Sequence, residues 1–273
     1  MAGPAARAGT LREFPNAGVA GIRVCADDES PVAQAGILLP GQLESRASPE
    51  IPRATAVWIM YLPAHFEETR GEVLHELVRT HPLGALVTVE DGGGLTANHV
   101  PFLLDPDPGP PGTLRAHVAR ANPVWRNFSR DVECLVIFQG PQTYVTPSWY
   151  ETKKQSGKVV PTYNYMVVHA HGVLRAVDDA AWLRTFVGRL TDRFEAPRSR
   201  PWAVTDAPED FIAMQLRAIV GIEIRLSRLV GKWKTSQNRN AADRAGVVAG
   251  LREAGDDDSR KMADAVGKLD KAG

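Results

Sequence analysis

Alternating apolar and polar residues predict a chain built mainly of short β-strands. Residues 113–118 and 219–226 alternate with a period of two, as half-buried strands do. The segments 83–89 and 95–104 flank the glycine-rich connection 91–94, which predicts a hairpin because glycine readily adopts positive φ. Further strands are expected at 133–138, at 143–145 and at 163–177, the last apolar on both faces and therefore expected to be buried on each side.

Helical spacing of apolar residues appears between and after these strands. We expect helices at 67–80, 180–193, 208–218 and 241–253, with a short helical crossing at 122–128. Asp178 or Asp179 is the expected cap of the second helix and Asp206 that of the third. We find no pair of helices joined by a short glycine turn of the kind that reads DNA. The expected class is mainly β with flanking helices (α+β), and a series of short strands favours a closed or half-closed barrel.

The two ends of the chain differ from its middle. Residues 1–59 are rich in Ala, Pro, Gly and Arg and have no sustained periodicity, so we expect a disordered extension or a start codon assigned too early. Residues 255–273 open with a glycine and three aspartates and are expected to fray as a polar tail. The folded domain is therefore expected over residues 60–254.

Composition narrows the classes of function. The 32 Lys and Arg residues balance the 32 Asp and Glu residues, whereas DNA-binding proteins usually carry a basic excess that neutralises phosphates. Direct DNA binding is therefore not supported, although a local basic patch would permit it. Cys25 and Cys134 are too few for a disulfide framework or a cysteine zinc site. We see neither a membrane span nor a signal sequence and expect a cytoplasmic protein.

Cationic and amide side chains gather around the end of the strand at 113–118. Arg115 and His117 lie within it, and Arg120 and Asn122 follow it. A guanidinium beside an amide offers several donors in fixed directions, which suits a phosphate dianion. The alternative is a solvated loop with surface arginines.

A second run of donors surrounds Trp233. It consists of Lys232, Lys234, Ser236, Gln237, Asn238 and Arg239. This density favours recognition of an anion or of the polar edge of a heteroaromatic ring. An exposed basic turn anchored by Trp233 is the alternative.

Aromatic and polar residues at three other places are also candidates. Trp149 and Tyr150 with Lys158 form a segment suited to covering a flat ring, unless Trp149 caps the core. Asn98 and His99 interrupt an apolar strand. They either form part of a cofactor site or make hydrogen bonds to the neighbouring backbone. The pair His169 and His171 suggests a metal or haem, but without a third ligand we interpret them as core residues and expect no metal site.

Eight sequence blocks occur in the order typical of one protein family. They are MYLPAHFEE at 60–68, THPLGALVT at 80–88, ANHVPFLLD at 97–105, HVARANPVWR at 117–126, FQGPQTYVTPSWY at 138–150, GKVVPTYNY at 157–165, VHAHG at 168–172 and GKWKTSQNR at 231–239. From residue 60 to about residue 251 the chain resembles the PaiB family, bacterial proteins described as FMN-binding negative transcriptional regulators.

The resemblance implies a fold, a cofactor and an assembly. It implies an FMN-binding split β-barrel like that of pyridoxamine-phosphate oxidases, and a homodimer with FMN at the subunit interface. Thr162, Tyr163 and Asn164 would lie beside the flavin, with Thr162 and Asn164 at its pyrimidine edge, and residues 231–239 would contact the flavin or a substrate. A flavin-dependent oxidoreductase and a haem-binding split-barrel protein remain alternatives. No catalytic residue is assigned, and whether the protein is an enzyme stays open.

Overall fold

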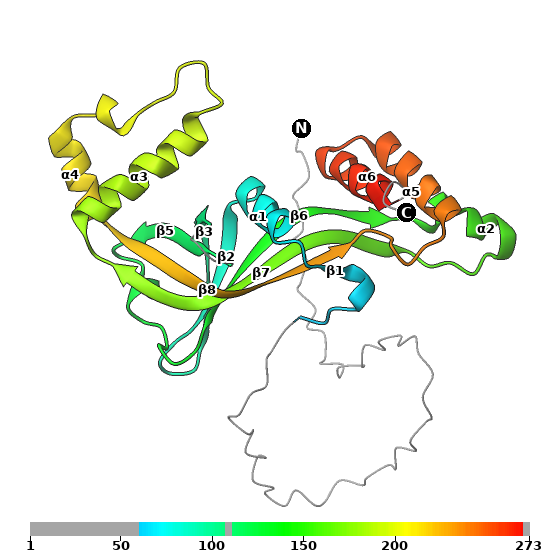
Figure 1. The fold of residues 1–273 in the computed structure, drawn as a ribbon, viewed down its shortest axis with the longest axis horizontal. Coiled ribbons are helices and arrows are strands. Elements are labelled where there is room, and N and C mark those ends of the chain that lie inside the picture. Colours follow the sequence, from blue (N-terminus) through cyan, green and yellow to red (C-terminus); the bar gives the residue numbers. More distant parts are fainter. Residues whose placement is uncertain (1–59, 107–110, 270–273) are drawn as a thin grey trace, which may run out of the picture. The chain divides into compact units, whose positions relative to one another are not determined.

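The computed structural model describes residues 60–106 and 111–269, which belong to one compact unit. The expectation for residues 1–59 lies outside the described residues. Eight strands form a single antiparallel sheet (Figure 1). They are β1 (Glu67–Glu68), β2 (Leu83–Val89), β3 (Leu95–Pro101), β4 (Leu103–Asp105), β5 (Thr113–Ala119), β6 (Cys134–Val145), β7 (Thr162–Val177) and β8 (Ile219–Lys234).

The sheet closes on itself through one bent segment. Its strand order is β3-β2-β6-β7-β8-β5-β4, with β1 added beside β8. The two ends of this order, β3 and β4, follow each other in the chain with only Phe102 between them. The amide of Phe102 donates to the carbonyl of Pro82 at 2.8 Å, which holds the bend. Because the same segment supplies both edges, the sheet forms a barrel, and the expected mainly β fold with flanking helices is confirmed.

Alternation along the strands fills the barrel with apolar side chains. Residues of β2, β6, β7 and β8 that point inward are fully buried at 0% exposure: Leu86, Val136, Phe138, Val168, Ala170, Ile222 and Ile224. The outer face of β7 is different, because Tyr165 and His169 are only half-buried and Val173 is 58% exposed. The expectation that β7 is buried on both sides was therefore right for one face and wrong for much of the other.

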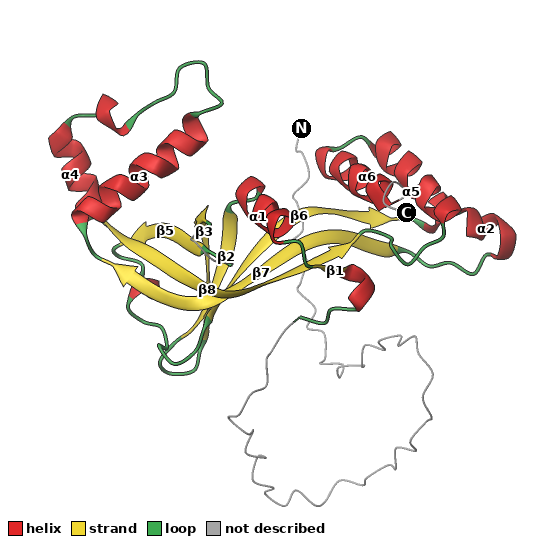
Figure 2. Ribbon diagram, in the orientation of Figure 1, coloured by secondary structure: helices red, strands yellow, loops and turns green. Residues whose placement is uncertain are grey.

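Helices lie at both ends of the long strands (Figure 2). They are α1 (Gly71–Thr80), α2 (Glu151–Ser156), α3 (Ala180–Glu195), α4 (Glu209–Arg217), α5 (Ala241–Ala254) and α6 (Asp257–Leu269), with 3-10 turns η1 (Ala64–Phe66), η2 (Pro123–Trp125), η3 (Pro147–Trp149) and η4 (Val204–Asp206). Of the two expected caps of α3, Asp179 is the actual one, since its carboxylate accepts from the amide of Trp182 at 2.7 Å. In the part of the chain described, no helix has the length and apolar character needed to cross a bilayer.

Several predicted boundaries were wrong. The first helix begins at Gly71 and not at residue 67, because Glu67 and Glu68 pair with β8. The strands expected at 133–138 and 143–145 are one strand, β6, with an irregularity between Gln139 and Gln142. Asp206 does not cap α4; its carboxylate accepts from the amide of Ala203.

The C-terminal segment is ordered where a frayed tail was expected. Residues Asp257–Leu269 form α6, which packs on α5 and β6 and buries Met262, Ala263 and Val266 completely. Apolar spacing within a strongly charged helix was the signal that sequence reasoning missed. The folded part therefore extends beyond residue 254.

Two helices are joined by a short glycine turn that went unrecognised in the sequence. Gly255, with φ of 72°, and Asp256 join α5 to α6. This pair does not resemble a DNA reader, because Asp256, Asp257 and Asp258 place negative charge at the start of α6, where a reading helix meets phosphates.

His171 on β7 is held neutral by its surroundings. Its Nδ1 lies 3.0 Å from the Nη2 of Arg228, and burial together with the charge of Arg228 and the proximity of His169 lowers its pKa to about 4, against a weaker opposing effect of Glu133. Within the described ranges no three His, Cys, Asp or Glu side chains are arranged to hold a metal ion.

Truncating Met262 tests the packing of α6. Met262→Ala should lower the free energy of unfolding by about 3 kcal/mol, because it removes a fully buried side chain and leaves a cavity. Urea unfolding followed by circular dichroism measures the change. Asp264→Ala, at an exposed position of the same helix, is the control and should have almost no effect. Equal effects of the two variants would show that α6 is not packed as described.

The buried His171 predicts acid sensitivity. Below pH 6.5 the unfolded chain takes up a proton that the folded protein refuses until about pH 4, so the free energy of unfolding should decrease across this window. After discounting for screening, the decrease should be about 2 kcal/mol. His171→Asn, which keeps an acceptor for Arg228, should flatten this part of the pH profile, whereas replacing the exposed His65 should not. An unaltered profile in the His171 variant would contradict the prediction.

Candidate functional site

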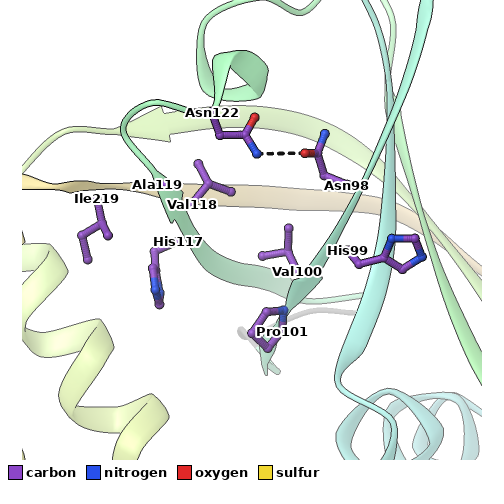
Figure 3. Close-up of a pocket in the computed structure, with 9 residues that line it drawn as sticks. All are labelled: Asn98, His99, Val100, Pro101, His117, Val118, Ala119, Asn122 and Ile219. Atoms are coloured by element: carbon purple, nitrogen blue, oxygen red, sulfur yellow. Dashed lines mark hydrogen bonds between the residues drawn. The ribbon is translucent and has the colours of Figure 1, made fainter.

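A cavity of about 340 Å³ lies between β3, β5 and the start of β8 (Figure 3). It is lined by Asn98, His99, Val100, Pro101, His117, Val118, Ala119, Asn122 and Ile219. Four of these residues, Asn98, His99, His117 and Asn122, are sequence-predicted site residues, and we refer to these four as the cavity group. Strand pairing between β5 and β8 and the bend between β3 and β4 bring them together.

The cavity group contains two buried polar atoms without partners. Asn122 donates from Nδ2 to Oδ1 of Asn98 at 2.8 Å and accepts from the amide of Val124 at 3.0 Å, so it also caps η2. Among the described atoms, Nδ2 of Asn98 and Nδ1 of His117 have no hydrogen-bond partner although both are buried. A buried polar group left unpaired costs about 1 to 3 kcal/mol, so the cavity is suited to a polar ligand.

The two histidines of this group have different environments. The ring of His117 packs edge-on against Phe186 of α3 at 5.8 Å between centroids, and burial lowers its pKa, which keeps it neutral. His99 is exposed, and its ring points away from Asn98 and Asn122 in Figure 3, as strand alternation requires. His117 therefore offers a neutral imidazole to the cavity, and His99 faces the other side of β3.

Arg115 is engaged by carboxylates of its neighbours. Its Nε donates to Glu223 at 3.0 Å, and its Nη1 bonds to Asp105, which also binds Arg189. Arg115 is thus part of an internal ion-pair network, and the expected phosphate contact has no support from its position.

Arg120 lies beside the cavity and also has internal partners. Its two Nη atoms bond to both oxygens of Asp178 at 2.7 and 2.6 Å, and its Nε donates to the carbonyl of Arg217 at 2.8 Å. A further bond at 3.1 Å reaches the carbonyl of Ile219, a cavity-lining residue. The Asp178 hydrogen bond raises the pKa of Arg120, and the reciprocal bond lowers the pKa of Asp178.

A second set of predicted residues lies at the far end of β7 and β8. We call Thr162, Asn164, Lys232, Lys234, Ser236 and Gln237 the ribbon group. Lys234 donates to Oγ1 of Thr162 at 2.7 Å, and Asn164 donates to Oγ of Ser236 at 2.9 Å. Asn164 is fully buried, and its Oδ1 has no partner among the described atoms. Ser236 has φ of 66°, unique among non-glycine residues in the described ranges, and strained backbone of this kind is enriched at functional sites.

Positive charge in the ribbon group is not balanced by carboxylates. Lys232 is 8% exposed, donates to the carbonyl of Tyr61 at 2.8 Å and lies 5.3 and 5.6 Å from the rings of Tyr61 and Tyr165. Burial, with the charges of Lys232 and Arg239, lowers the pKa of Lys234. None of the ion pairs in the described chain includes Lys232, Lys234 or the neighbouring Arg239. The segment begins as part of β8, so the alternative of an exposed basic turn is wrong for its first half.

Within the ribbon group, Gln237 accepts from the amide of Thr235 at 2.7 Å and bonds to the carbonyl of Trp233, so it holds its own turn. The remaining predicted residues fall outside both groups or within the core. Asn238, Lys158 and Tyr163 are exposed.

Trp149 and Tyr150 are core residues. A Cβ on Gly250 of α5 would lie 2.2 Å from the Trp149 ring, so α5 packs directly on this side chain. Tyr150 is 1% exposed, and the guanidinium of Arg239 lies 4.5 Å from its ring centroid. The alternative in which Trp149 caps the core is therefore the correct one, and the loop expected to cover a flat ring is not open.

Within one chain the cavity group and the ribbon group lie far apart. His117 pairs with Gly221 and Tyr165 pairs with Lys234, so the groups are separated by about 40 Å of β8 at 3.3 Å per residue. Sequence reasoning missed Asp178, which it treated only as a possible helix cap. The apolar cavity walls at Val100, Val118 and Ile219 were also missed, because an apolar lining has the same sequence signature as a core.

Comparisons with known proteins identify the family of this chain. A family model described as "Putative FMN-binding domain" matches residues 60–228. The chain is 35% identical to an uncharacterized protein of Aspergillus fumigatus, over 72% of this chain and 92% of that protein. It is 30% identical to the Protease synthase and sporulation protein PAI 2 of Bacillus subtilis, over 75% and 95%. A solved FAD and haem binding protein from Mycobacterium smegmatis shares 18% identity over 67% of this chain and 80% of that chain, with a TM-score of 0.45.

These matches confirm the resemblance to PaiB. Because similar proteins occur in a fungus as well as in a bacterium, the bacterial origin that the resemblance implied stays a prediction. By the extent of both the model match and the sequence identity, the chain belongs to the FMN-binding domain family, with FMN as the cofactor.

Proposed function

We propose that this protein is a flavin-binding protein of the PaiB type that holds FMN against the cavity group. The observation that carries the proposal is one cavity lined by two residues, Asn98 and His117, that each hold a buried polar atom without a partner in the described chain. A flavin ring and its ribityl chain present carbonyl, imide and hydroxyl groups that satisfy such atoms. Bound FMN supplies redox chemistry, while the protein contributes position and electrostatics.

The size of the cavity supports a site that one protomer does not complete. A volume of about 340 Å³ is at the lower end of the range for pockets that enclose a small molecule. FMN is larger than a typical fragment, so only part of it fits between β3 and β5. We infer that the rest of the flavin lies against another surface, and a second copy of the chain is the partner that the family resemblance implies.

We assign the dimer interface to the outer face of the sheet. Ala85, Ile137, His169 and Val230 form one row across β2, β6, β7 and β8, and all four are only half-buried. Three of the four, Ala85, Ile137 and Val230, are apolar, and apolar side chains gathered on an exposed face are typical of an interface. A two-fold arrangement through this face would let the ribbon group of one protomer reach the cavity group of the other, as isologous contacts permit.

The regulatory part of the proposal does not require DNA reading by this chain. Charge is balanced overall, and the aspartates at the start of α6 disfavour phosphate contact. We propose that the protein acts as a negative regulator through its flavin state and its partners. The proposal is supported by its similarity to PaiB proteins.

A visible spectrum of purified protein with added FMN tests the cofactor. Flavin bound in a protein gives a blue-region absorption band that co-elutes with the chain on gel filtration. A sharp Soret band after haem addition, with no retention of FMN, would favour the haem-binding alternative instead.

His117→Phe is expected to separate stability from binding. Phenylalanine keeps the packing against Phe186 but removes the unpartnered Nδ1, so flavin-free protein should melt at the same or a higher temperature. FMN affinity should fall by about tenfold, because one hydrogen bond to the ligand is lost. Calorimetric titration and thermal melts measure the two effects. Unchanged FMN affinity would remove His117 from the site.

Ile137→Asp is expected to give a monomer. An unpaired carboxylate in the middle of an apolar interface costs several kcal/mol, roughly enough to dissociate a dimer at micromolar concentration. Sedimentation velocity measures the assembly, and circular dichroism checks that the fold is retained. Phe211→Asp, at an exposed apolar position on α4, is the matched control and should leave the assembly unchanged. A wild-type protein that sediments as a monomer at all concentrations would contradict the dimer.

A further inference from the structure

The hydrogen-bonding capacity of Arg120 is almost fully used. A guanidinium has five N–H donors, and four of those on Arg120 bond to Asp178 twice, to the carbonyl of Arg217 and to the carbonyl of Ile219. One N–H on Nη1 remains. In this state Arg120 has only this one donor for an incoming anion, and the Asp178 carboxylate already balances its positive charge.

The two kinds of bond to Arg120 play different parts. The carbonyls of Arg217 and Ile219 carry no charge and fix the orientation of the guanidinium from the β8 side. The Asp178 carboxylate takes the two parallel Nη donors, at 2.7 and 2.6 Å, which is the geometry that arginine also uses for a phosphate. If Asp178 leaves, Arg120 keeps its two carbonyl bonds, one of which holds it to Ile219 of the cavity lining.

The ion pair is weak enough to exchange. The Arg120 side chain is 39% exposed and that of Asp178 is 52% exposed. Exposed pairs of this kind contribute little to stability because water screens them. A phosphate carries up to two negative charges and three acceptor oxygens, so it competes well against one solvated carboxylate.

We propose that Asp178 is an internal anion that occupies Arg120 in the flavin-free protein and is exchanged for the FMN phosphate. Asp178 thereby acts as a competitor for the ligand phosphate: it raises the cost of engaging Arg120, and it lowers the affinity for FMN without affecting a flavin that lacks the phosphate. The inference rests on the proposed FMN site and adds to it a residue that tunes how tightly the phosphate is held. Asp178 lies between the end of β7 and the cap of α3, so its release leaves the Asp179 cap in place.

A double-mutant cycle with two ligands tests the exchange. Dissociation constants for FMN and for riboflavin, which lacks the phosphate, are measured by fluorescence quenching in wild type, Asp178→Asn, Arg120→Ala and the double variant. Asp178→Asn should tighten FMN binding by about fivefold, the factor that corresponds to a surface ion pair, and leave riboflavin binding unchanged. The gain should vanish when Arg120 is absent, and Arg120→Ala alone should weaken FMN more than riboflavin.

A second surface pair supplies the matched control. Arg184 and Glu209 join α3 to α4 with the same bidentate geometry, both bonds at 2.7 Å, and side-chain exposures of 41% and 73%. Glu209→Gln removes one negative charge from the same helix pair, away from Arg120. It should change neither FMN nor riboflavin affinity. Thermal melts of every variant establish that each is folded.

Three results would overturn the inference while leaving the proposed function intact. Weaker FMN binding in Asp178→Asn would mean that Asp178 positions Arg120 for the ligand. An equal gain for riboflavin, or a gain that persists without Arg120, would mean that no exchange at the phosphate takes place. Failure of the wild type to bind FMN at all would instead overturn the proposed function, and this inference with it.

Discussion

The closure of the sheet by the bent β3–β4 segment is the constraint on which the rest of the structure depends. Because one stretch of chain forms both edges, the strands enclose an apolar interior, and Phe102 at the bend is buried in it. The same bend sets β3 near β5, so Asn98 meets Asn122 although 24 positions separate them. The cavity is therefore a by-product of closure, because β3 and β5 come close to each other without pairing: β3 pairs with β2, and β5 pairs with β8 and β4.

Polar groups around this barrel fall into satisfied and unsatisfied sets, and the difference separates structural from functional roles. Arg115 has carboxylate partners on two strands and stabilises the sheet. Asn98 and His117 retain buried atoms without partners in the described chain. Arg120 is intermediate, since its bonds to carbonyls are structural but its carboxylate partner is solvated. A ligand with several hydrogen-bond acceptors therefore changes the interaction energies of Asn98, His117 and Arg120 far more than those of Arg115.

Much of the fold was predictable because local patterns and tertiary structure agree. The hairpin of β2 and β3, the long strand β7 and the helix α3 with its aspartate cap follow from alternation, glycine positions and capping chemistry. The prediction failed where tertiary contacts compete with local preference. Residues 257–269 looked like a polar tail, yet Met262 and Val266 are buried against α5 and β6. Glu67 and Glu68 extend a helical pattern, but pairing with β8 makes them a strand.

The sequence by itself determined the family, the cofactor class and the residue types that we propose to contact the flavin, because these depend on motifs that are contiguous in the chain. Only the tertiary structure decided which of those residues have free hydrogen-bonding capacity. In the sequence, Trp149 and Arg115 have the side-chain types of binding residues. In the structure, α5 covers Trp149, and carboxylates from β4 and β8 accept the hydrogen bonds of Arg115. The physical reason is that partners of a polar or aromatic side chain come from distant segments, which a local pattern does not record.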